Sequence, residues 1–185
     1  PGVYRIAPDG ETTRLPGTDQ IVFPNALAFD SAGTLYVTET FSGDISSGSF
    51  AVGGIWCVPE GGTAELWDRD ELLTGLPPAF FPFPVGANGI GVHHGDVYVA
   101  NTDKALLVRV PVQPDGSAGR SEVWKRVEDV PESPLCNSAA FPVMLDGLAL
   151  DAQGNVYVAV ISRNAIVRIN MTALYLLKNS VAIDR

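Results

Sequence analysis

The stretch "PNALAFDSAGTLYVTET", from Pro24 to Thr40, places an Asn directly before a short apolar strand. A turn containing Gly33 follows, and a second apolar strand then ends in an acid, Glu39. Short β-branched and aromatic runs bounded by Gly, Asn and Asp are typical of antiparallel strands joined by a turn. A polar amide directly ahead of a buried-looking strand raises the question of whether the chain repeats this arrangement.

The same pattern occurs twice more, as "ANGIGVHHGDVYVANT" (Ala87–Thr102) and "LDGLALDAQGNVYVAV" (Leu145–Val160). The polar residues ahead of the strands, called the leaders from here on, are Asn25, Asn88 and Asp146, which stand 63 and 58 residues apart. Each leader is followed by a small residue, an apolar strand and a turn that contains Gly. Self-similarity at such a period indicates an array of equivalent structural units.

Each copy continues with two further short strands, for example "GGIWCVPEGG" followed by "AELWDR". Four antiparallel strands in each unit are what a propeller blade requires. The pattern therefore predicts an all-β fold, a β-propeller of four-stranded antiparallel blades. The predicted blades are residues 25–70, 88–128 and 146–179, with a half blade at 2–15 and the start of another at 180–185.

Three full blades plus a half blade do not complete an ordinary propeller. Propellers typically have four to eight blades and close into a ring, which leaves no long sheet edge exposed. Three alternatives follow: the chain is a fragment with an incomplete ring, a second copy completes the ring as a homo-oligomer, or a smaller and strained ring forms.

The composition excludes several classes of function. The chain has 185 residues, 46% of them hydrophobic, and a formal net charge of −9. No basic stripe is available for nucleic acid, and no apolar run approaches the ~20 residues that cross a bilayer. No signal segment opens the chain, so a soluble protein without a membrane partner is expected, in an unknown compartment. Cys57 and Cys136 lack zinc-site spacing, and the sequence leaves a disulfide and two thiols open.

The three leaders are predicted to converge at one mouth of the central channel, because each precedes the innermost strand of its blade. Glu39, Asn101 and Ser162, at the ends of the second strands, are expected near the same face, and Glu39 and Asn101 are candidates for substrate binding. Convergent carboxylate and amide oxygens suit a hard divalent cation such as calcium or magnesium. Asp146 is the only acid among the leaders and hence the candidate general base. The alternative is that each leader caps a turn by bonding its own backbone.

The turns between first and second strands should lie at the opposite end of the blades. His93 and His94 fall in such a turn and are expected to be solvent-exposed turn residues, not ligands. Asp30 and Asp151, which follow the first strands of two copies, are likewise interpreted as turn residues.

At the three repeated stretches the chain resembles the gluconolactonase, regucalcin and senescence-marker-protein family, within the wider group of strictosidine-synthase-like propellers. The resemblance rests on "FPNALAFDSAGTLYVTET", "GANGIGVHHGDVYVANT" and "LDGLALDAQGNVYVAV" and extends to about Asn170. It implies a six-bladed propeller with a divalent cation, calcium being expected, held by one Glu, two Asn and one Asp, and an activity on lactones or esters. By register, Asn25 and Asn88 match the two family Asn positions, and Asp146 matches the Asp that binds metal and serves as base.

The chain departs from this family at three points. The metal-binding Glu of the family comes from an earlier blade, and no residue before Asn25 matches it. Ala26 stands where the family has Gly after its first Asn. An insertion, "ESPLCNSAAFPVML" (Glu132–Leu145), precedes Asp146. The sequence therefore supports two hypotheses: a calcium-dependent lactone hydrolase, and a non-catalytic propeller fragment that serves as a binding module.

Overall fold

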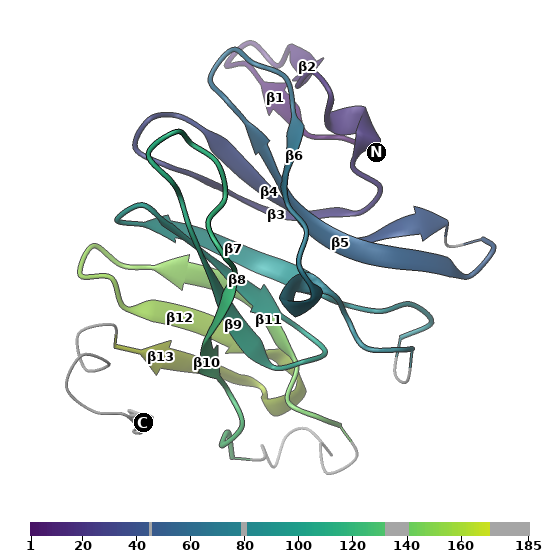
Figure 1. Ribbon diagram of the computed structural model, residues 1–185, viewed down its shortest axis with the longest axis vertical. Coiled ribbons are helices and arrows are strands. Elements are labelled where there is room, and N and C mark those ends of the chain that lie inside the picture. The colour runs from purple at the N-terminus through teal and green to yellow at the C-terminus, as the bar shows by residue number, and fades with distance from the viewer. Residues whose placement is uncertain (45, 79–80, 132–140, 171–185) are drawn as a thin grey trace.

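The described part of the chain folds into a fan of antiparallel sheets (Figure 1). A computed structural model describes residues 1–44, 46–78, 81–131 and 141–170. The first four-stranded sheet contains β3 (Pro24–Phe29), β4 (Leu35–Asp44), β5 (Ser49–Val58) and β6 (Glu65–Asp68). The second contains β7 (Ala87–His93), β8 (Asp96–Asn101), β9 (Leu106–Pro111) and β10 (Glu122–Arg126).

The remaining strands form two smaller sheets. The third sheet contains β11 (Leu145–Leu150), β12 (Val156–Val160) and β13 (Ala165–Ile169). A hairpin of β1 (Tyr4–Ile6) and β2 (Thr12–Arg14) precedes the first sheet. Short 3-10 helices within the described residues are η1 (Thr18–Gln20), η2 (Glu71–Leu73) and η4 (Ile161–Arg163).

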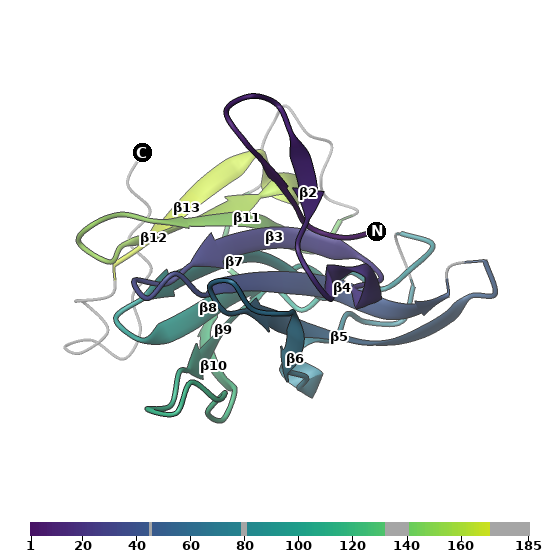
Figure 2. The same cartoon turned by 90° about the horizontal axis from the view of Figure 1, so that it is seen from above.

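The first strands of the three sheets, β3, β7 and β11, lie next to one another, and each sheet runs outward from its first strand in chain order (Figure 2). This is the arrangement of propeller blades around an axis. The prediction of an all-β propeller with an incomplete ring is therefore confirmed. The predicted blade boundaries stay predictions, and residues 171–179 and 180–185, assigned to a last strand and a further blade, lie outside the described residues.

The hydrophobic core lies between the sheets, because alternate residues of each strand point to opposite faces. On β4, Tyr36 faces the second sheet and is 2% exposed, while its neighbour Val37 faces the other way and is 1% exposed. Between the first and second sheets the buried core includes Ile55, Ile90, Val99 and Val108. Between the second and third sheets it includes Leu107, Leu145, Val156, Val158 and Val160.

The outer face of the first sheet is covered only in part. Strands β4 and β5 on this face pack against the N-terminal segment through residues such as Val3 and Ile21. On the innermost strand of the same face, Leu27 is 53% exposed and Phe29 is 62% exposed. The residues that flank the hairpin of β1 and β2 thus cover the outer strands of this face but not the inner one.

Two of the turns between first and second strands are built on the same aspartate arrangement. Asp30 Oδ1 accepts bonds from the backbone nitrogens of Ala32 and Thr34, at 2.9 and 2.8 Å. Asp151 Oδ1 accepts equivalent bonds from Gln153 and Asn155, at 3.0 and 2.8 Å. These bonds are the Asx-turn pattern that Asp favours. Asp30 and Asp151 are therefore turn residues, as expected from the sequence.

The described residues contain no helix that is long and apolar enough to cross a membrane. Cys57 is a free, half-buried thiol, and burial raises its pKa. Its predicted candidate partner, Cys136, lies outside the described residues, as does most of the insertion at 132–145.

Candidate functional site

Each leader lies in a β-bulge at the start of the first strand of its sheet. In the first sheet Pro24 pairs with Glu39 and Leu27 pairs with Val37, so two residues, Asn25 and Ala26, oppose a single residue of β4. The second and third sheets have the same irregularity after Ala87 and after Leu145. Bulges of this kind re-aim side chains and are common next to active sites.

The second bulge touches both the first and the third, so the structure places the leaders on three successive neighbouring strands. The Thr38 hydroxyl of the first sheet donates a 2.6 Å hydrogen bond to the backbone oxygen of Asn88 in the second. At Gly89 the second bulge lies so close to the third that an added Cβ would stand 2.5 Å from the backbone oxygen of Asp146. The predicted convergence of Asn25, Asn88 and Asp146 has this physical basis.

Two threonines fix the orientation of the two asparagine side chains. Asn25 Nδ2 donates to Thr40 Oγ1 at 2.9 Å, and Asn88 Nδ2 donates to Thr102 Oγ1 at 3.0 Å. Thr40 Oγ1 in turn donates its only proton to the backbone oxygen of Ala87, at 2.9 Å, so towards Asn25 it can only accept. The amide nitrogen must therefore face the threonine, and the amide oxygen of Asn25 is left free to accept from another group.

The third leader has a different neighbour. The residue equivalent to Thr40 and Thr102 is Ile161, since its backbone nitrogen bonds to Met144 as theirs bond to the segment before each leader. Asp146 is half-buried, and no described side chain donates a hydrogen bond or forms an ion pair with its carboxylate. Within the described part of the chain, neither carboxylate oxygen is thus taken by a side chain.

The leaders do not form the backbone caps that a purely structural role would require. Among the described residues, no backbone nitrogen donates to the side chain of Asn25, Asn88 or Asp146, whereas Asp30 and Asp151 each accept two such bonds. The local chemistry of the leaders is therefore unlike that of the acids in the turns.

Glu39 and Asn101 lie at the same end of the sheets but are bonded within the chain. Glu39 is 1% exposed, and its carboxylate accepts from the backbone nitrogen of Val22 at 2.7 Å, from Trp56 Nε1 at 3.2 Å and from Arg69 at 3.3 Å. These bonds tie three separate segments together beneath the first leader.

Asn101 has the equivalent place in the second sheet and is fully buried. Its Nδ2 donates to the backbone oxygens of Leu72 and Thr74, at 2.8 and 2.9 Å, and its oxygen accepts from the backbone of Lys104 at 3.1 Å. The register makes Val160 the corresponding residue of the third sheet. Ser162 lies two residues further on, in η4, and its hydroxyl accepts a bond from the backbone nitrogen of Met144, two residues before the third leader, so it lies at the same end of the sheets.

The oxygen atoms of the leaders fit a hard cation in chemical type. Two amide oxygens and one carboxylate belong to the donors that calcium and magnesium prefer, and all three come from bulges that touch. The leaders include a single acid, and no group of three or more His, Cys, Asp or Glu side chains suited to a metal occurs among the described residues. The present residues would thus supply part of a coordination shell, to be completed by water or other groups.

The opposite end of the sheets carries the two histidines. His93 is the last residue of β7 and is half-buried, with its ring beside Gly154, and His94 is exposed in the turn with a φ of 49°. Burial, followed by the neighbouring His94, lowers the pKa of His93. Both lie away from the leaders. His94 is an exposed turn residue, as expected, whereas His93 ends β7 and is half-buried, so the expectation of an exposed turn residue was wrong for His93.

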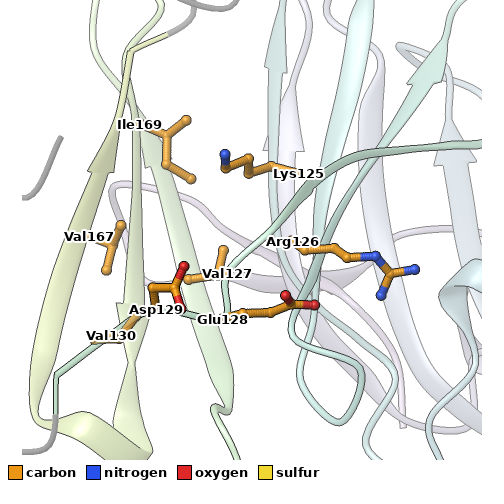
Figure 3. A pocket seen from close by; sticks show the side chains of 8 residues that line it. All are labelled: Lys125, Arg126, Val127, Glu128, Asp129, Val130, Val167 and Ile169. Atoms are coloured by element: carbon orange, nitrogen blue, oxygen red, sulfur yellow. The ribbon is translucent and has the colours of Figure 1, made fainter. Parts of the chain in front are cut away.

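A hollow elsewhere on the surface is lined by none of the predicted site residues. It lies between β10 and the outer strand β13 (Figure 3). Its lining is two bases, two acids and four aliphatic side chains: Lys125, Arg126, Glu128, Asp129, Val127, Val130, Val167 and Ile169. The inner strands that carry the leaders do not contribute to it.

Sequence reasoning missed the role of the threonines and the bulges. The signals were present: "TET" and "ANT" both end in a Thr directly after Glu39 and Asn101, and each leader is followed by Ala or Gly. A small residue next to a polar one at a strand start is compatible with a bulge, but only the pairing register reveals it.

The class of protein defined by these features is an incomplete β-propeller with polar residues gathered at the starts of its inner strands. A model of the SMP-30/Gluconolactonase/LRE-like region matches residues 85–176 of the chain. The resemblance to the gluconolactonase family is therefore confirmed over this part of the chain. A comparison with curated proteins found no match.

Several solved structures share the fold. A gluconolactonase from Xanthomonas campestris is 14% identical, with a TM-score of 0.60, and the match covers 91% of this chain and 52% of that one. The periplasmic gluconolactonase of Pseudomonas aeruginosa is 16% identical, with a TM-score of 0.57 and coverage of 94% and 46%. A catalytically inactive virginiamycin B lyase from Staphylococcus aureus is 17% identical, with a TM-score of 0.53 and coverage of 91% and 45%. The chain spans about half the length of these proteins, and at such identities the match shows the fold alone.

Proposed function

We propose that this chain forms one side of a lactone-hydrolysing site in which the three leaders bind a divalent cation, calcium being the first candidate. The observation that carries the proposal is the orientation of the leaders. Asn25 and Asn88 turn their amide nitrogens to threonines, and Asp146 has no partner among the described residues, so all three present oxygen atoms. The similarity to the gluconolactonase family supports the same assignment.

The proposed chemistry is attack of water on a lactone carbonyl. A divalent cation held by the leaders would polarise that carbonyl and lower the pKa of a bound water. Asp146 would accept the proton of the attacking water, because it is the only acid among the leaders. The amide oxygens of Asn25 and Asn88 carry no proton and no full charge, so they would bind and orient without competing for that proton.

Glu39 and Asn101 were predicted to bind substrate, and this stays a prediction. Their bonds to their own chain support a positioning role instead. Glu39 holds Val22 and Trp56 beneath the first leader, and Asn101 fixes the segment after η2 beside the second. In this form of the proposal Glu39 and Asn101 hold the segments around the site in place and do not contact the substrate directly.

The competing proposal is a non-catalytic propeller fragment that acts as a binding module. Two observations favour it: the chain spans about half of the propellers it resembles, and only one of its leaders is an acid. A second copy of the chain is one way to supply the remaining blades. Light scattering separates these cases, since a dimer mass would support completion by a second copy and a clean monomer that unfolds cooperatively would exclude it.

Calcium titration followed by thermal unfolding tests the cation site directly. A ligand at 100 times its Kd stabilises the folded state by about 2.7 kcal/mol. For a chain of this length that is a rise of ~5–10 °C in Tm. Asp146→Asn should abolish the rise, whereas Asp129→Asn, which removes the same charge at an exposed position, should keep it. A Tm that does not respond to calcium or magnesium in the unaltered chain would refute the cation site.

A further inference from the structure

Five phenylalanine rings gather at the same end of the sheets as the leaders. This aromatic cluster consists of Phe23, Phe41, Phe50, Phe81 and Phe83. The ring centroids of Phe23 and Phe41 are 4.7 Å apart and stacked, and those of Phe41 and Phe83 are 5.3 Å apart. Such separations are typical of favourable aromatic pairs. The cluster joins segments that are far apart in the sequence.

Thr40 links the aromatic cluster to the first leader by hydrogen bonds. The backbone oxygen of Phe23 accepts a 3.1 Å bond from the backbone nitrogen of Thr40. The hydroxyl of the same threonine accepts the 2.9 Å bond from Asn25 Nδ2, and Phe41 follows it directly in β4. The position of Phe23 and Phe41 relative to Asn25 is therefore fixed by hydrogen bonds.

The segment that carries Phe83 is held beside the second leader in the same way. The backbone oxygen of Gly86 accepts from the backbone of Thr102 at 3.1 Å, and the hydroxyl of Thr102 accepts from Asn88 Nδ2 at 3.0 Å. The carboxylate of Asp103 accepts a further bond, 2.7 Å long, from the backbone of Val85. The segment just after Phe83 is thus held in place by Thr102, the residue that also orients Asn88, and by Asp103.

The sequence places a phenylalanine at the equivalent position of the third sheet. "FPV" occurs at 83–85 and again at 141–143, in each case with the Phe five residues ahead of a leader, Asn88 or Asp146. Phe141 is half-buried. An aromatic residue before the inner strand is therefore a repeated feature of this end of the sheets.

The cluster is partly accessible to solvent. Strands β4 and β5 each have ten residues, and their far ends project beyond the other sheets on the side where the segment between η2 and β7 also lies (Figures 1 and 2). Only Phe41 is fully buried; Phe23, Phe50, Phe81 and Phe83 are half-buried. Apolar, aromatic walls combined with a few oriented polar groups are the usual composition of small-molecule sites.

We propose that the aromatic cluster is the wall of a substrate subsite and selects lactones or esters that carry an aromatic or apolar group over polyhydroxylated sugar lactones. This inference rests on the proposed function for the position of the reacting carbonyl at the leaders. The partly exposed rings of Phe23 and Phe83 would stack on the apolar group, while Asn25 and Asn88 face the carbonyl end. A sugar lactone would have to place hydroxyl groups against these rings without hydrogen-bond partners, which is unfavourable.

The test compares the binding of two probes, dihydrocoumarin and glucono-1,5-lactone, to the full chain by titration calorimetry with and without calcium. Dihydrocoumarin should bind at least tenfold more tightly. Phe83→Leu keeps an apolar side chain but removes the ring, and it should weaken dihydrocoumarin binding about 2- to 12-fold, the range expected for an aromatic pair. Phe29→Leu is the matched control, because Phe29 is exposed on the outer face of the first sheet and should leave binding unchanged.

The outcomes separate this inference from the proposed function. Dihydrocoumarin binding that needs Phe83 but persists without calcium and in Asp146→Asn would support the aromatic subsite and count against the cation site. Equal affinity for both lactones, or an equal effect of Phe83→Leu and Phe29→Leu, would overturn the aromatic subsite even if calcium raises Tm. Absence of dihydrocoumarin binding under all conditions would also overturn it.

Discussion

Replacement of Gly89 by alanine tests the contact between the second and third bulges. Gly89 follows the leader Asn88, and a Cβ at this position would lie 2.5 Å from the backbone oxygen of Asp146 and 2.8 Å from the carbonyl carbon of Gly147, and it would also meet the backbone nitrogen of Leu148. Real Cβ atoms do not approach backbone this closely, and backbone atoms cannot turn aside as a flexible side chain can. The two inner strands must therefore separate.

The chain supplies its own controls for this substitution. The position after the leader is Ala26 in the first sheet, where a Cβ is accommodated in the core between the first and second sheets. In the third sheet it is Gly147, around which an added Cβ would meet no described atom within 4 Å. Gly147→Ala is therefore the matched control, with the same added atom at an equivalent bulge.

The two substitutions are expected to change the stability of the folded chain in different directions. Overpacking of a well-packed contact costs roughly 1–3 kcal/mol, and we expect Gly89→Ala near the upper end because backbone atoms must move. For a chain of this length about 3 kcal/mol lowers Tm by ~6–12 °C. Gly147→Ala restricts the unfolded chain without a clash, so it should leave Tm unchanged or raise stability by about 0.4–1 kcal/mol.

Urea unfolding and thermal unfolding of both variants measure the difference, and calcium titration of each adds a readout of the site. Gly89→Ala should also weaken calcium binding, since it displaces Asn88 from Asp146. If Gly89→Ala and Gly147→Ala unfold at the same Tm, the second and third bulges are not in contact, and the convergence of the leaders loses its physical basis.

Three further substitutions probe individual buried or partly buried side chains that form hydrogen bonds. Thr40→Val removes the acceptor that orients Asn25, so it should lower the free energy of unfolding in urea by about 1–2 kcal/mol and weaken calcium binding. Thr40→Ser should restore both the stability and the calcium affinity. An unchanged calcium affinity in Thr40→Val would contradict the orienting role. Glu39→Ala leaves three donors without a partner, so we expect a loss of about 3 kcal/mol in urea unfolding, and a loss below 1 kcal/mol would show that water replaces the carboxylate. Burial raises the pKa of Asp68 above its ordinary value despite the bond from Ser121, so the folded state binds the extra proton and the unaltered protein loses stability as pH rises through that window. Asp68→Asn should therefore be more stable, relative to the unaltered protein, at pH 7 than at pH 4, and equal differences at the two pH values would argue against the raised pKa.

The fold could be predicted from the sequence because the propeller repeats its signal. One copy of an apolar strand, a Gly turn and a second strand fits many β folds, but three copies at similar spacing fit few. The alternation within "TLYVTET" also predicts that neighbouring side chains face different sheets, as Tyr36 and Val37 do. The convergence of the leaders followed from the same repetition, since equivalent residues of neighbouring blades must lie side by side.

The finer structure of the candidate site could not be read in this way. A bulge changes the register by one residue, so alternation alone does not tell where the side chains of Asn25 and Ala26 point. Hydrogen bonds such as those of Glu39 to Trp56 and Arg69 join segments whose separation carries no sequence signal. The sequence likewise did not show that the third sheet ends its second strand at Val160 and that Ser162 follows in a 3-10 helix.

The neighbours of the leaders indicate that each of the three sheets presents a side-chain oxygen atom at the leader position, and not merely a turn. An asparagine offers one free oxygen only if its amide nitrogen is occupied elsewhere, and the first two sheets provide Thr40 and Thr102 for this purpose. An aspartate has no nitrogen to place, and a threonine beside it would donate a hydrogen bond to one of its oxygens. The third sheet has an aspartate leader and, at the position of the threonines, Ile161, whose side chain has no hydrogen-bond donor. Leader and neighbour thus differ together, and in all three sheets the leader keeps an oxygen that no described residue occupies, which a turn-capping role would not require.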